Sequence, residues 1–301
     1  MQPIQYEEIQ CKTVLNKVNA PGLFFRWTIN PYRGCQHACV YCFARHTHQF
    51  LGYDSGHDFN QKIVVKVNAP EVLREELRRP TWRSELVVLG TATDPWQQAE
   101  VRYRVTRRIV EALAERANPL SILTKSSIIT QDTDVLQEAA RRAPVQVNFT
   151  VGFLDEDLWR RIEPGTPSPR KRLEALQRLA KAGIPTGIML APILPGLTDT
   201  RESLEEVIRA AVAHGAQRVH PVVLPLRPGS KEWFMPFLRQ AYPYLSPQYQ
   251  RMYKGSYAPE SYTKRVYETV EELRQKLTPE RSVGVPEPPK RQSMGQLALA
   301  F

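Results

Sequence analysis

From about residue 60 onward, short apolar runs alternate with longer segments in which apolar residues recur every three or four positions. The apolar runs predict strands, at residues 63–67, 86–89, 120–123, 145–151, 186–190 and 218–224. The longer segments predict helices, at about residues 98–117, 132–140, 170–182 and 202–214. Asp132 is a good N-cap residue for the second of these helices. This strand–helix alternation indicates right-handed βαβ units and a parallel sheet, either open or rolled into a full or partial barrel.

The last third of the chain has a different pattern. Seven of the twelve tyrosines lie between Tyr242 and Tyr267, interleaved with basic residues. Apolar residues at positions 266, 270, 273 and 277 predict one closing helix. From Pro279 the chain is rich in proline and weakly apolar until its last six residues, which predicts a mobile tail.

The composition is that of a soluble protein with a large core. The 301 residues are 42% hydrophobic and 24% charged, enough for one large domain or two ordinary ones. Lysine and arginine number 41 against 31 acidic residues, and the formal net charge of +10 favours a polyanionic partner such as a nucleic acid. We see no apolar run of ~18 residues and no secretory signal, and therefore expect a cytoplasmic protein with no membrane segment.

Three of the four cysteines lie close together. Cys35, Cys39 and Cys42 fall within eight residues, whereas Cys11 stands apart. Four cysteines are too few for a disulfide scaffold in a chain of this length. Pairing within the loop would also leave one thiol over. The spacing therefore predicts a metal site, in which three thiolates face one point.

Two metals compete for this loop. Zinc needs a fourth ligand in a structural site, which His37, His46 or His48 would supply. An iron–sulfur cluster of the [4Fe–4S] type normally takes four cysteines, so three would leave one iron open to a small molecule. The second C-x-x-C pair of a zinc ribbon is absent from the sequence, which favours iron–sulfur.

The spacing C-x-x-x-C-x-aromatic-C is the signature of the radical S-adenosylmethionine (SAM) superfamily. The surrounding segment NPYRGCQHACVYCFAR, residues 30–45, resembles the spore photoproduct lyase-like branch of that superfamily. Further segments also resemble this branch, at residues 90–100, 123–126, 162–165 and 191–199. The resemblance covers roughly residues 20–225.

The resemblance implies an α/β fold, a partial (β/α)6 TIM-like barrel with a helical, tyrosine-rich C-terminal cap. The first strand would span roughly residues 24–29, with the cysteine loop directly after it, since such barrels carry their chemistry on loops at the carboxyl ends of strands. We accordingly divide the chain into an extension, the barrel, the cap and the tail, at residues 1–20, 21–235, 236–278 and 279–301.

The resemblance also implies the cofactors. Cys35, Cys39 and Cys42 would hold a [4Fe–4S] cluster whose open iron binds SAM through its amino and carboxylate groups. One electron from the reduced cluster then cleaves the C–S bond, and the resulting 5′-deoxyadenosyl radical takes a hydrogen atom from the substrate. A flavodoxin or ferredoxin would supply the electron.

Seven residues receive cofactor-binding roles from the same resemblance: Tyr41, Thr91, Thr93, Asp94, Lys125, Asn148 and Arg172. Tyr41 would pack near the adenine, and the Thr91–Asp94 segment would bind the SAM amino group, unless Asp94 and Pro95 form an ordinary turn. Lys125 would pair with the SAM carboxylate, and Asn148 would reach the ribose. Arg172 would touch the cofactor or form a structural ion pair with Glu163.

One position departs from the family. The spore lyase uses a cysteine as a hydrogen-atom donor just before the segment that follows the second strand, and Thr91 stands there in this chain. A hydroxyl donates a hydrogen atom poorly because its O–H bond is much stronger than S–H. Cys11 could replace that thiol if the N-terminal segment covers the barrel mouth, but a lone cysteine is more often a small buried apolar residue. The C-terminal tyrosines form either a radical relay, a base-stacking surface or a packed cap.

The last six residues, QLALAF, carry a separate motif. Gln296, Leu299 and Phe301 resemble the peptide by which bacterial replication and repair proteins bind the sliding clamp. Leu299 and Phe301 would fill an apolar pocket of the clamp, with Gln296 fixing the orientation. Alternatively the segment is an apolar tail that packs on its own barrel.

Together these patterns support a radical SAM enzyme that acts on DNA or another nucleic acid, as in spore photoproduct lyase-like repair. A second hypothesis keeps the radical chemistry but gives it a peptide or small-molecule substrate. A third is a zinc-stabilised nucleic-acid-binding module without catalytic activity.

Overall fold

The computed structural model describes residues 3–19 and 23–277. The predicted tail at residues 279–301 lies outside this range, and so do Gln296, Leu299 and Phe301 of the clamp-like motif. Within the described part of the chain, no helix is both long and apolar enough to cross a membrane.

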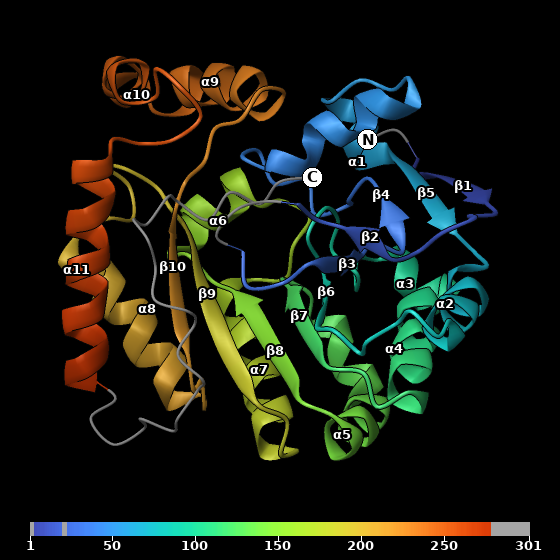
Figure 1. The fold of residues 1–301 in the computed structure, drawn as a ribbon. Helices are drawn as coiled ribbons and strands as arrows, with labels where there is room; N and C mark the ends of the chain where they lie inside the picture. Colours follow the sequence, from blue (N-terminus) through green and yellow to red (C-terminus); the bar gives the residue numbers. More distant parts are fainter. Residues whose placement is uncertain (1–2, 20–22, 278–301) are drawn as a thin grey trace.

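A curved sheet with six parallel strands forms the centre of the molecule (Figure 1). In spatial order these strands are β3 (Trp27–Ile29), β6 (Val87–Leu89), β7 (Leu120–Thr124), β8 (Val145–Thr150), β9 (Thr186–Ile193) and β10 (Val219–Val223). The short β2 (Asn16–Lys17) adds an antiparallel edge to β3. Because the spatial order follows the chain order and β10 does not pair with β3, the sheet is a partial barrel, as predicted.

Helices cover one side of this sheet (Figure 1), namely α4 (Val105–Glu115), α5 (Thr133–Arg142), α7 (Pro169–Lys181) and α8 (Arg201–Ala213). Their apolar stripes are fully buried, as at Ile109 and Leu113 of α4. The strands contribute the opposing layer, in which Val147 and Phe149 of β8 are also fully buried. The predicted helices at 170–182 and 202–214 are therefore confirmed within one residue.

The helix predicted at residues 98–117 is two helices. α3 (Ala99–Tyr103) ends at Arg104, whose φ of 54° is left-handed, and α4 starts directly after it. The buried Glu100 carboxylate accepts hydrogen bonds of 3.0 Å from the backbone N–H groups of both Thr106 and Arg107. It therefore satisfies the free N–H groups at the start of α4, a capping contact that the apolar spacing does not reveal.

Asp132 precedes α5 as predicted, but its carboxylate does not cap the helix. It accepts hydrogen bonds from the indole of Trp96 (2.8 Å), from Arg104 (2.9 Å) and from Arg107 (3.1 Å) instead. Asp132 thus ties the loop after β6 and the start of α4 to α5.

The apolar run at residues 63–67 forms a strand outside the barrel. β5 (Lys62–Lys66) pairs in parallel with β1 (Gln5–Ile9) and in antiparallel fashion with β4 (Tyr32–Arg33), in a separate three-stranded sheet. The periodicity of a β-branched run does not indicate which sheet it joins. Three helical segments flank this sheet, η1 (Phe43–Leu51), α1 (His57–Gln61) and α2 (Ala69–Arg78).

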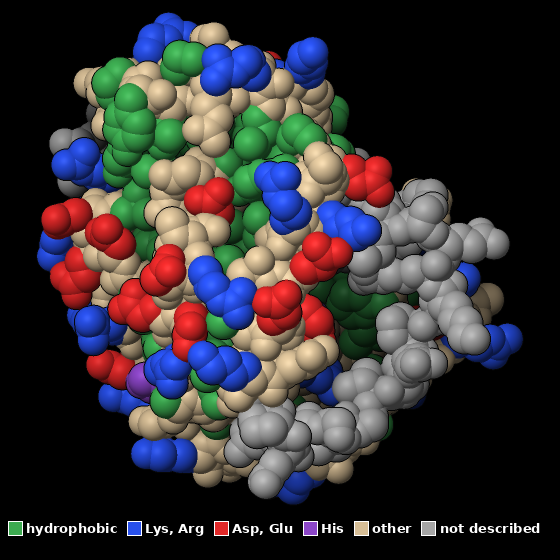
Figure 2. All heavy atoms as spheres, turned by 90° about the vertical axis from the view of Figure 1, so that its left-hand side faces the viewer, with side chains coloured by type: hydrophobic (Ala, Val, Ile, Leu, Met, Phe, Trp, Pro, Cys, Tyr) green, Lys and Arg blue, Asp and Glu red, His purple; other side chains and the backbone are tan. Residues whose placement is uncertain are grey.

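The described part of the chain after β10 forms a helical cap. It consists of α9 (Ser230–Ala241), a turn η3 (Pro243–Leu245), α10 (Ser246–Met252) and α11 (Glu260–Leu277), which is the predicted closing helix. Figure 2 shows apolar side chains gathered at the end of the molecule where α9 and α10 lie, above the charged surface around α8 and α11. The domain boundary drawn between residues 235 and 236 falls inside α9, and the division of the chain into domains stays a prediction.

The clustered tyrosines pack within this cap. Tyr249 and Tyr253 stack with ring centroids 5.5 Å apart, and the Tyr253 hydroxyl donates to the carbonyl of Leu224 just after β10 (2.8 Å). Tyr262 donates to Asp199 (2.6 Å) in the loop before α8. The tyrosines therefore join the cap to the barrel, which supports the packed-cap interpretation.

Candidate active site

The cysteine loop follows β4, shortly after the carboxyl end of β3, and three backbone hydrogen bonds hold it in place. The backbone N–H of Cys35 donates to Phe59 O (2.9 Å), and that of Val40 donates to Ile162 O (3.0 Å). The N–H of Gly165 donates to His37 O (3.1 Å). Segments before β5 and after β8 therefore fix a loop that has no regular secondary structure between β4 and η1.

Two glycines permit these close contacts. Gly34 has a φ of +79°, and a Cβ there would lie 2.8 Å from Lys62 O. A Cβ at Gly165 would lie 2.1 Å from Gln36 O. Only glycine allows the backbone to approach this closely, so both positions determine the shape of the cysteine loop.

None of the three thiols is in a disulfide, and they lie close enough for their charges to act on one another. Cys35 and Cys39 have exposed fractions of 7% and 6%. Burial raises the pKa of Cys35, and negative charge on Asp94, Cys42 and Cys39 raises it further. Burial also raises the pKa of Cys39, to about 12. Cys35 and Cys39 therefore ionise readily only when a cationic partner stabilises their thiolates, as bound iron does.

Across residues 3–19 and 23–277, no three His, Cys, Asp or Glu side chains are grouped so that they could hold one metal ion. Zinc requires its ligands around one centre, whereas each thiolate on an iron–sulfur cubane binds a different iron. The cluster on the cysteine loop stays a prediction.

The three histidines considered as zinc ligands all have other partners. His37 Nδ1 lies 3.3 Å from Asp94 Oδ2, His46 Nδ1 lies 2.8 Å from Phe43 O, and His48 Nε2 lies 3.0 Å from Lys62 O. Each histidine therefore has one ring nitrogen engaged, while the buried Nδ1 of His48 has no hydrogen-bond partner among the described residues.

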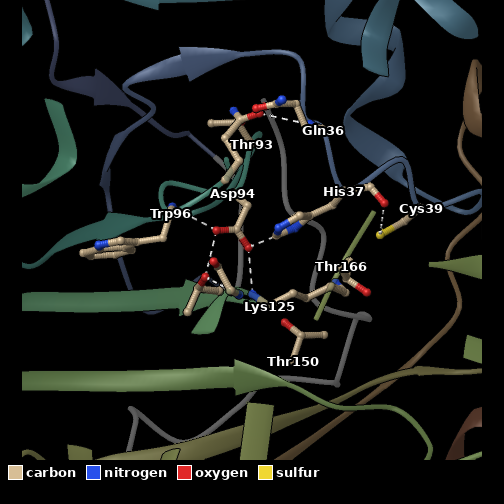
Figure 3. Close-up of polar contacts among 12 residues, drawn as sticks. Gln36, His37, Cys39, Thr93, Asp94, Trp96, Lys125, Thr150 and Thr166 are labelled. Atoms are coloured by element: carbon tan, nitrogen blue, oxygen red, sulfur yellow. Dashed lines mark hydrogen bonds and ion pairs between the residues drawn. The ribbon is translucent and has the colours of Figure 1, made fainter. Parts of the chain in front are cut away.

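Asp94 is the centre of a polar network beside the loop (Figure 3). Its carboxylate accepts hydrogen bonds from the backbone of Trp96 (3.0 Å), the hydroxyl of Thr124 (2.7 Å) and the backbone of Lys125 (2.7 Å). His37 of the cysteine loop faces the same carboxylate, and burial lowers the pKa of His37, which keeps the ring neutral. Asp94 therefore links the cysteine loop to the ends of β6 and β7.

Thr93 and Thr91 support the same junction. The Thr93 hydroxyl donates to Gly34 O (2.6 Å), and the amide of Gln97 donates to that carbonyl and to Thr93 (3.1 and 2.9 Å). Thr91 lies 3.4 Å from the side-chain amide of Asn30. The Thr91–Asp94 segment is thus brought beside the cysteine loop with most of its polar atoms already paired, and its SAM-binding role stays a prediction.

Glu163 lies on the other side of the loop, fully buried, and forms short contacts with the Tyr41 hydroxyl and the Arg172 guanidinium. Burial raises the pKa of this carboxyl, but Arg172 and Lys125 lower it more strongly, so the net pKa lies below its usual range. Arg172 also donates to Thr150 O (3.0 Å) and Pro167 O (2.9 Å). The structural ion pair considered for Glu163 and Arg172 is therefore present.

Lys125 and Asn148 retain polar atoms that other groups can use. The Lys125 side chain extends from the end of β7 toward Thr166 (Figure 3), with its ammonium 5.7 Å from the centre of the Tyr41 ring. Within the described residues this ammonium has no hydrogen bond or ion pair. Asn148, in the middle of β8, accepts one hydrogen bond from Gln146 (3.3 Å) and does not join the contacts of the cysteine loop.

Sequence reasoning missed the residues that hold the loop in place. The side-chain carbonyl of Gln97 accepts a hydrogen bond from the backbone N–H of Gln36 (3.0 Å), in addition to the two hydrogen bonds that its amide group donates. His37 was considered only as a zinc ligand. Their partners lie about sixty residues away in the chain, so spacing alone does not reveal these contacts. The available signal was their position in the segments that resemble the spore lyase branch.

A partial barrel with three thiols on the loop after its first strand defines a class of enzyme, in which a cluster at the barrel mouth generates a radical. Residues 29–211 match the family model of the radical SAM superfamily. The chain belongs to this superfamily and is a radical SAM enzyme.

Several proteins in other organisms are similar to this chain. An uncharacterized protein of Mycobacterium tuberculosis (strain H37Rv) is 46% identical over 272 residues, which span 90% of this chain and 80% of that protein. An uncharacterized protein of Methanocaldococcus jannaschii is 30% identical, over 67% of this chain and 73% of that protein. A protein of Pseudomonas phage M6 named radical SAM Nalpha-GlyT isomerase is 28% identical, over 63% of this chain and 37% of its own.

Solved structures of spore photoproduct lyase share the fold. One mutant has a TM-score of 0.68 at 18% identity, over 91% of this chain and 80% of the lyase. A mutant with bound AdoMet and dinucleoside spore photoproduct has a TM-score of 0.64 at 17% identity, over 87% and 77% of the two chains. The resemblance inferred from the sequence is confirmed at the level of superfamily and fold.

Proposed function

We propose that this radical SAM enzyme holds a [4Fe–4S] cluster on Cys35, Cys39 and Cys42, binds SAM at the open iron, and acts on a nucleic acid. The observation that carries the proposal is the placement of three reduced, neighbouring thiols on the loop after the first strand of a six-stranded partial barrel. When bound, the reduced cluster supplies the electron that cleaves SAM to the 5′-deoxyadenosyl radical.

The chain's own residues bind and orient the cofactor. Lys125 offers a free ammonium beside the cysteine loop, suited to a carboxylate. Tyr41 lies against Lys125 and is held by Glu163, so its ring has a fixed orientation for packing near the adenine. Asp94 and Thr93 keep the loop in place through His37 and Gly34, and Arg172 acts through Glu163.

A nucleic-acid substrate is favoured by charge and by the relatives. The net charge of +10 attracts phosphates, and one lyase structure of the same fold holds a dinucleoside spore photoproduct. Thr91 takes the place of the lyase's hydrogen-donor cysteine, which argues for a related reaction rather than an identical one. The alternative is a peptide or small-molecule substrate, and the salt dependence of DNA binding distinguishes it from a nucleic acid.

Reconstitution with iron and sulfide under anaerobic conditions tests the cofactors. The wild-type protein should turn brown and release 5′-deoxyadenosine with SAM and dithionite, and then with a flavodoxin or ferredoxin. Replacing Cys35, Cys39 or Cys42 by Ala should abolish both results, whereas Cys11→Ala should leave cluster binding intact. A wild-type protein that binds iron and sulfide normally but releases no 5′-deoxyadenosine would disprove the enzymatic role.

The substrate is tested with DNA that carries the thymine spore photoproduct. We expect binding that weakens steeply with salt, because phosphate contacts release counterions, and conversion of the modified base in the presence of SAM. Salt-insensitive, negligible DNA binding by an enzyme that cleaves SAM would instead assign a peptide or small molecule.

A further inference from the structure

Arg45 is a fully buried arginine in η1, three residues after the last cysteine of the loop. Its exposed fraction is 0%. A guanidinium stays protonated in proteins, so the fold buries a full positive charge at this point. Such burial is strongly unfavourable unless an opposite charge lies nearby.

The hydrogen-bond partners of Arg45 are all neutral. The guanidinium donates to Cys39 O (3.0 and 3.3 Å) and to Gly56 O (2.8 Å). Weaker donations complete the set, to Ser55 O, Ala38 O and Asn60 Oδ1. No carboxylate within 4.0 Å balances its charge in the described part of the chain, and Asp54 acts on it only at longer range.

Aromatic rings close off the rest of the guanidinium. The ring centroid of Phe59 lies 5.3 Å from Arg45 Cζ, and that of Trp233 lies 4.7 Å from it. Trp233 belongs to α9 of the cap, and His57 packs edge-on against its ring at 5.1 Å. These rings exclude water, which leaves the charge of Arg45 poorly screened.

The cysteines, as thiolates, would provide the negative charge that is missing beside the Arg45 guanidinium. Burial lowers the pKa of Arg45, and the three groups that most raise it are Cys42, Cys39 and Cys35 as thiolates. A [4Fe–4S] cluster with three thiolate ligands carries one net negative charge when oxidised and two when reduced. A fixed positive charge beside it stabilises the reduced state more than the oxidised state.

We propose that Arg45 is a positioning residue that raises the reduction potential of the cluster, by holding an unscreened positive charge against the cysteine loop. This inference rests on the proposed function. In the step concerned, the cluster gains one electron from an external reductant, a flavodoxin, ferredoxin or dithionite. No bond forms or breaks, and Arg45 neither gains nor loses a proton.

The test is a redox titration of the reconstituted holoprotein, without SAM, followed by electron paramagnetic resonance. Arg45→Gln removes the charge and keeps hydrogen-bond donors, while Arg45→Lys keeps the charge. We expect Arg45→Gln to lower the ratio of reduced to oxidised cluster about tenfold at a fixed potential, a negative shift of about 59 mV for a one-electron couple. Arg45→Lys should shift much less.

Arg239→Gln is the matched control, because Arg239 is exposed on α9 and its charge is screened by solvent. Its potential should equal that of the wild type. An unchanged potential in Arg45→Gln with full iron content would overturn the proposal. Equal shifts in Arg45→Gln and Arg45→Lys would also overturn it, since geometry rather than charge would then be responsible.

Trp233→Leu decides the matter if Arg45→Gln does not fold. This variant keeps the charge but admits water, so the potential should move in the same negative direction by a smaller amount. An unchanged potential in Trp233→Leu would then count against the role of Arg45. A wild-type protein that assembles no cluster is a different result, because it defeats the proposed function itself.

Discussion

The ion pair of Glu163 and Arg172 shows how much individual buried residues contribute near the cysteine loop. Both side chains are almost completely buried, and Glu163 also receives the hydroxyl of Tyr41. Removing one member of a buried pair leaves the other charge without compensation, which costs far more than breaking a surface pair. Glu163 therefore matters for stability, and through Tyr41 for the orientation of a ring in the cysteine loop.

We expect Glu163→Gln to lower the free energy of unfolding by about 3–5 kcal/mol in urea titrations at neutral pH. Because the folded-state pKa of Glu163 is depressed, its contribution is complete above the unfolded pKa of about 4.3 and is lost as pH falls through the lower folded pKa. The difference between wild type and variant should therefore shrink on acidification below about pH 4.

The exposed pair of Arg201 and Glu272, 2.9 Å apart, provides the control. Glu272→Gln should cost less than about 1 kcal/mol. Similar losses for the two variants would show that the pair of Glu163 and Arg172 is not electrostatically buried.

Among the elements, the loop between α6 (Glu156–Ile162) and α7 presses directly on the cysteine loop. Ile162 O accepts the N–H of Val40, and the N–H of Gly165 donates to His37 O. The backbone approach at Gly165 is so close that a side chain has no space there. The cysteine loop thus takes its shape from an element about 120 residues further along the chain.

Gly165→Ala should displace the cysteine loop, because the new Cβ would lie 2.1 Å from Gln36 O. We expect a loss of stability of about 1–3 kcal/mol and a reduced iron content after reconstitution. Gly255→Ala is the control, since a Cβ at Gly255 meets nothing within 4 Å. Full iron content in Gly165→Ala would mean that the loop adapts without this contact.

On the scale of the whole molecule, the cap and the barrel are joined by the tyrosine cluster. Tyr253 donates to Leu224 O after the last barrel strand, while the buried hydroxyl of its stacking partner Tyr249 has no hydrogen-bond partner among the residues that the structure describes. The cap also places Trp233 on Arg45 and so reaches the cysteine loop. The C-terminal cap therefore contacts both the end of the barrel and the segment that follows the cysteine loop.

A pair of tyrosine variants measures this junction. Tyr253→Phe should destabilise the protein by about 1 kcal/mol, because Leu224 O loses its donor. Tyr249→Phe should be neutral or stabilising, because it removes a buried hydroxyl that has no partner. Thermal unfolding of both variants checks the prediction, and an equal loss in both would contradict it.

Much of the fold was predictable because its signals are local. Apolar runs located all the later barrel strands, and apolar spacing located α7, α8 and α11. One error came from a competing contact: the Glu100 carboxylate caps the start of α4, and the helix predicted at residues 98–117 is broken at Arg104. The strand predicted at residues 63–67 is present, but its pairing with the N-terminal β1 could not be predicted because the two strands lie far apart in the chain.

By itself, the sequence determined the order of strands and helices, the three thiols of the cysteine loop and the superfamily, since periodicity and ligand spacing act over a few residues. Only the tertiary structure decided that Asp94 joins His37, that Glu163 pairs with Arg172 and holds Tyr41, and that Arg45 is buried under Trp233. These contacts bring together residues that are mostly far apart in the chain. Their burial and charge balance exist only once the barrel, the loop and the cap have packed.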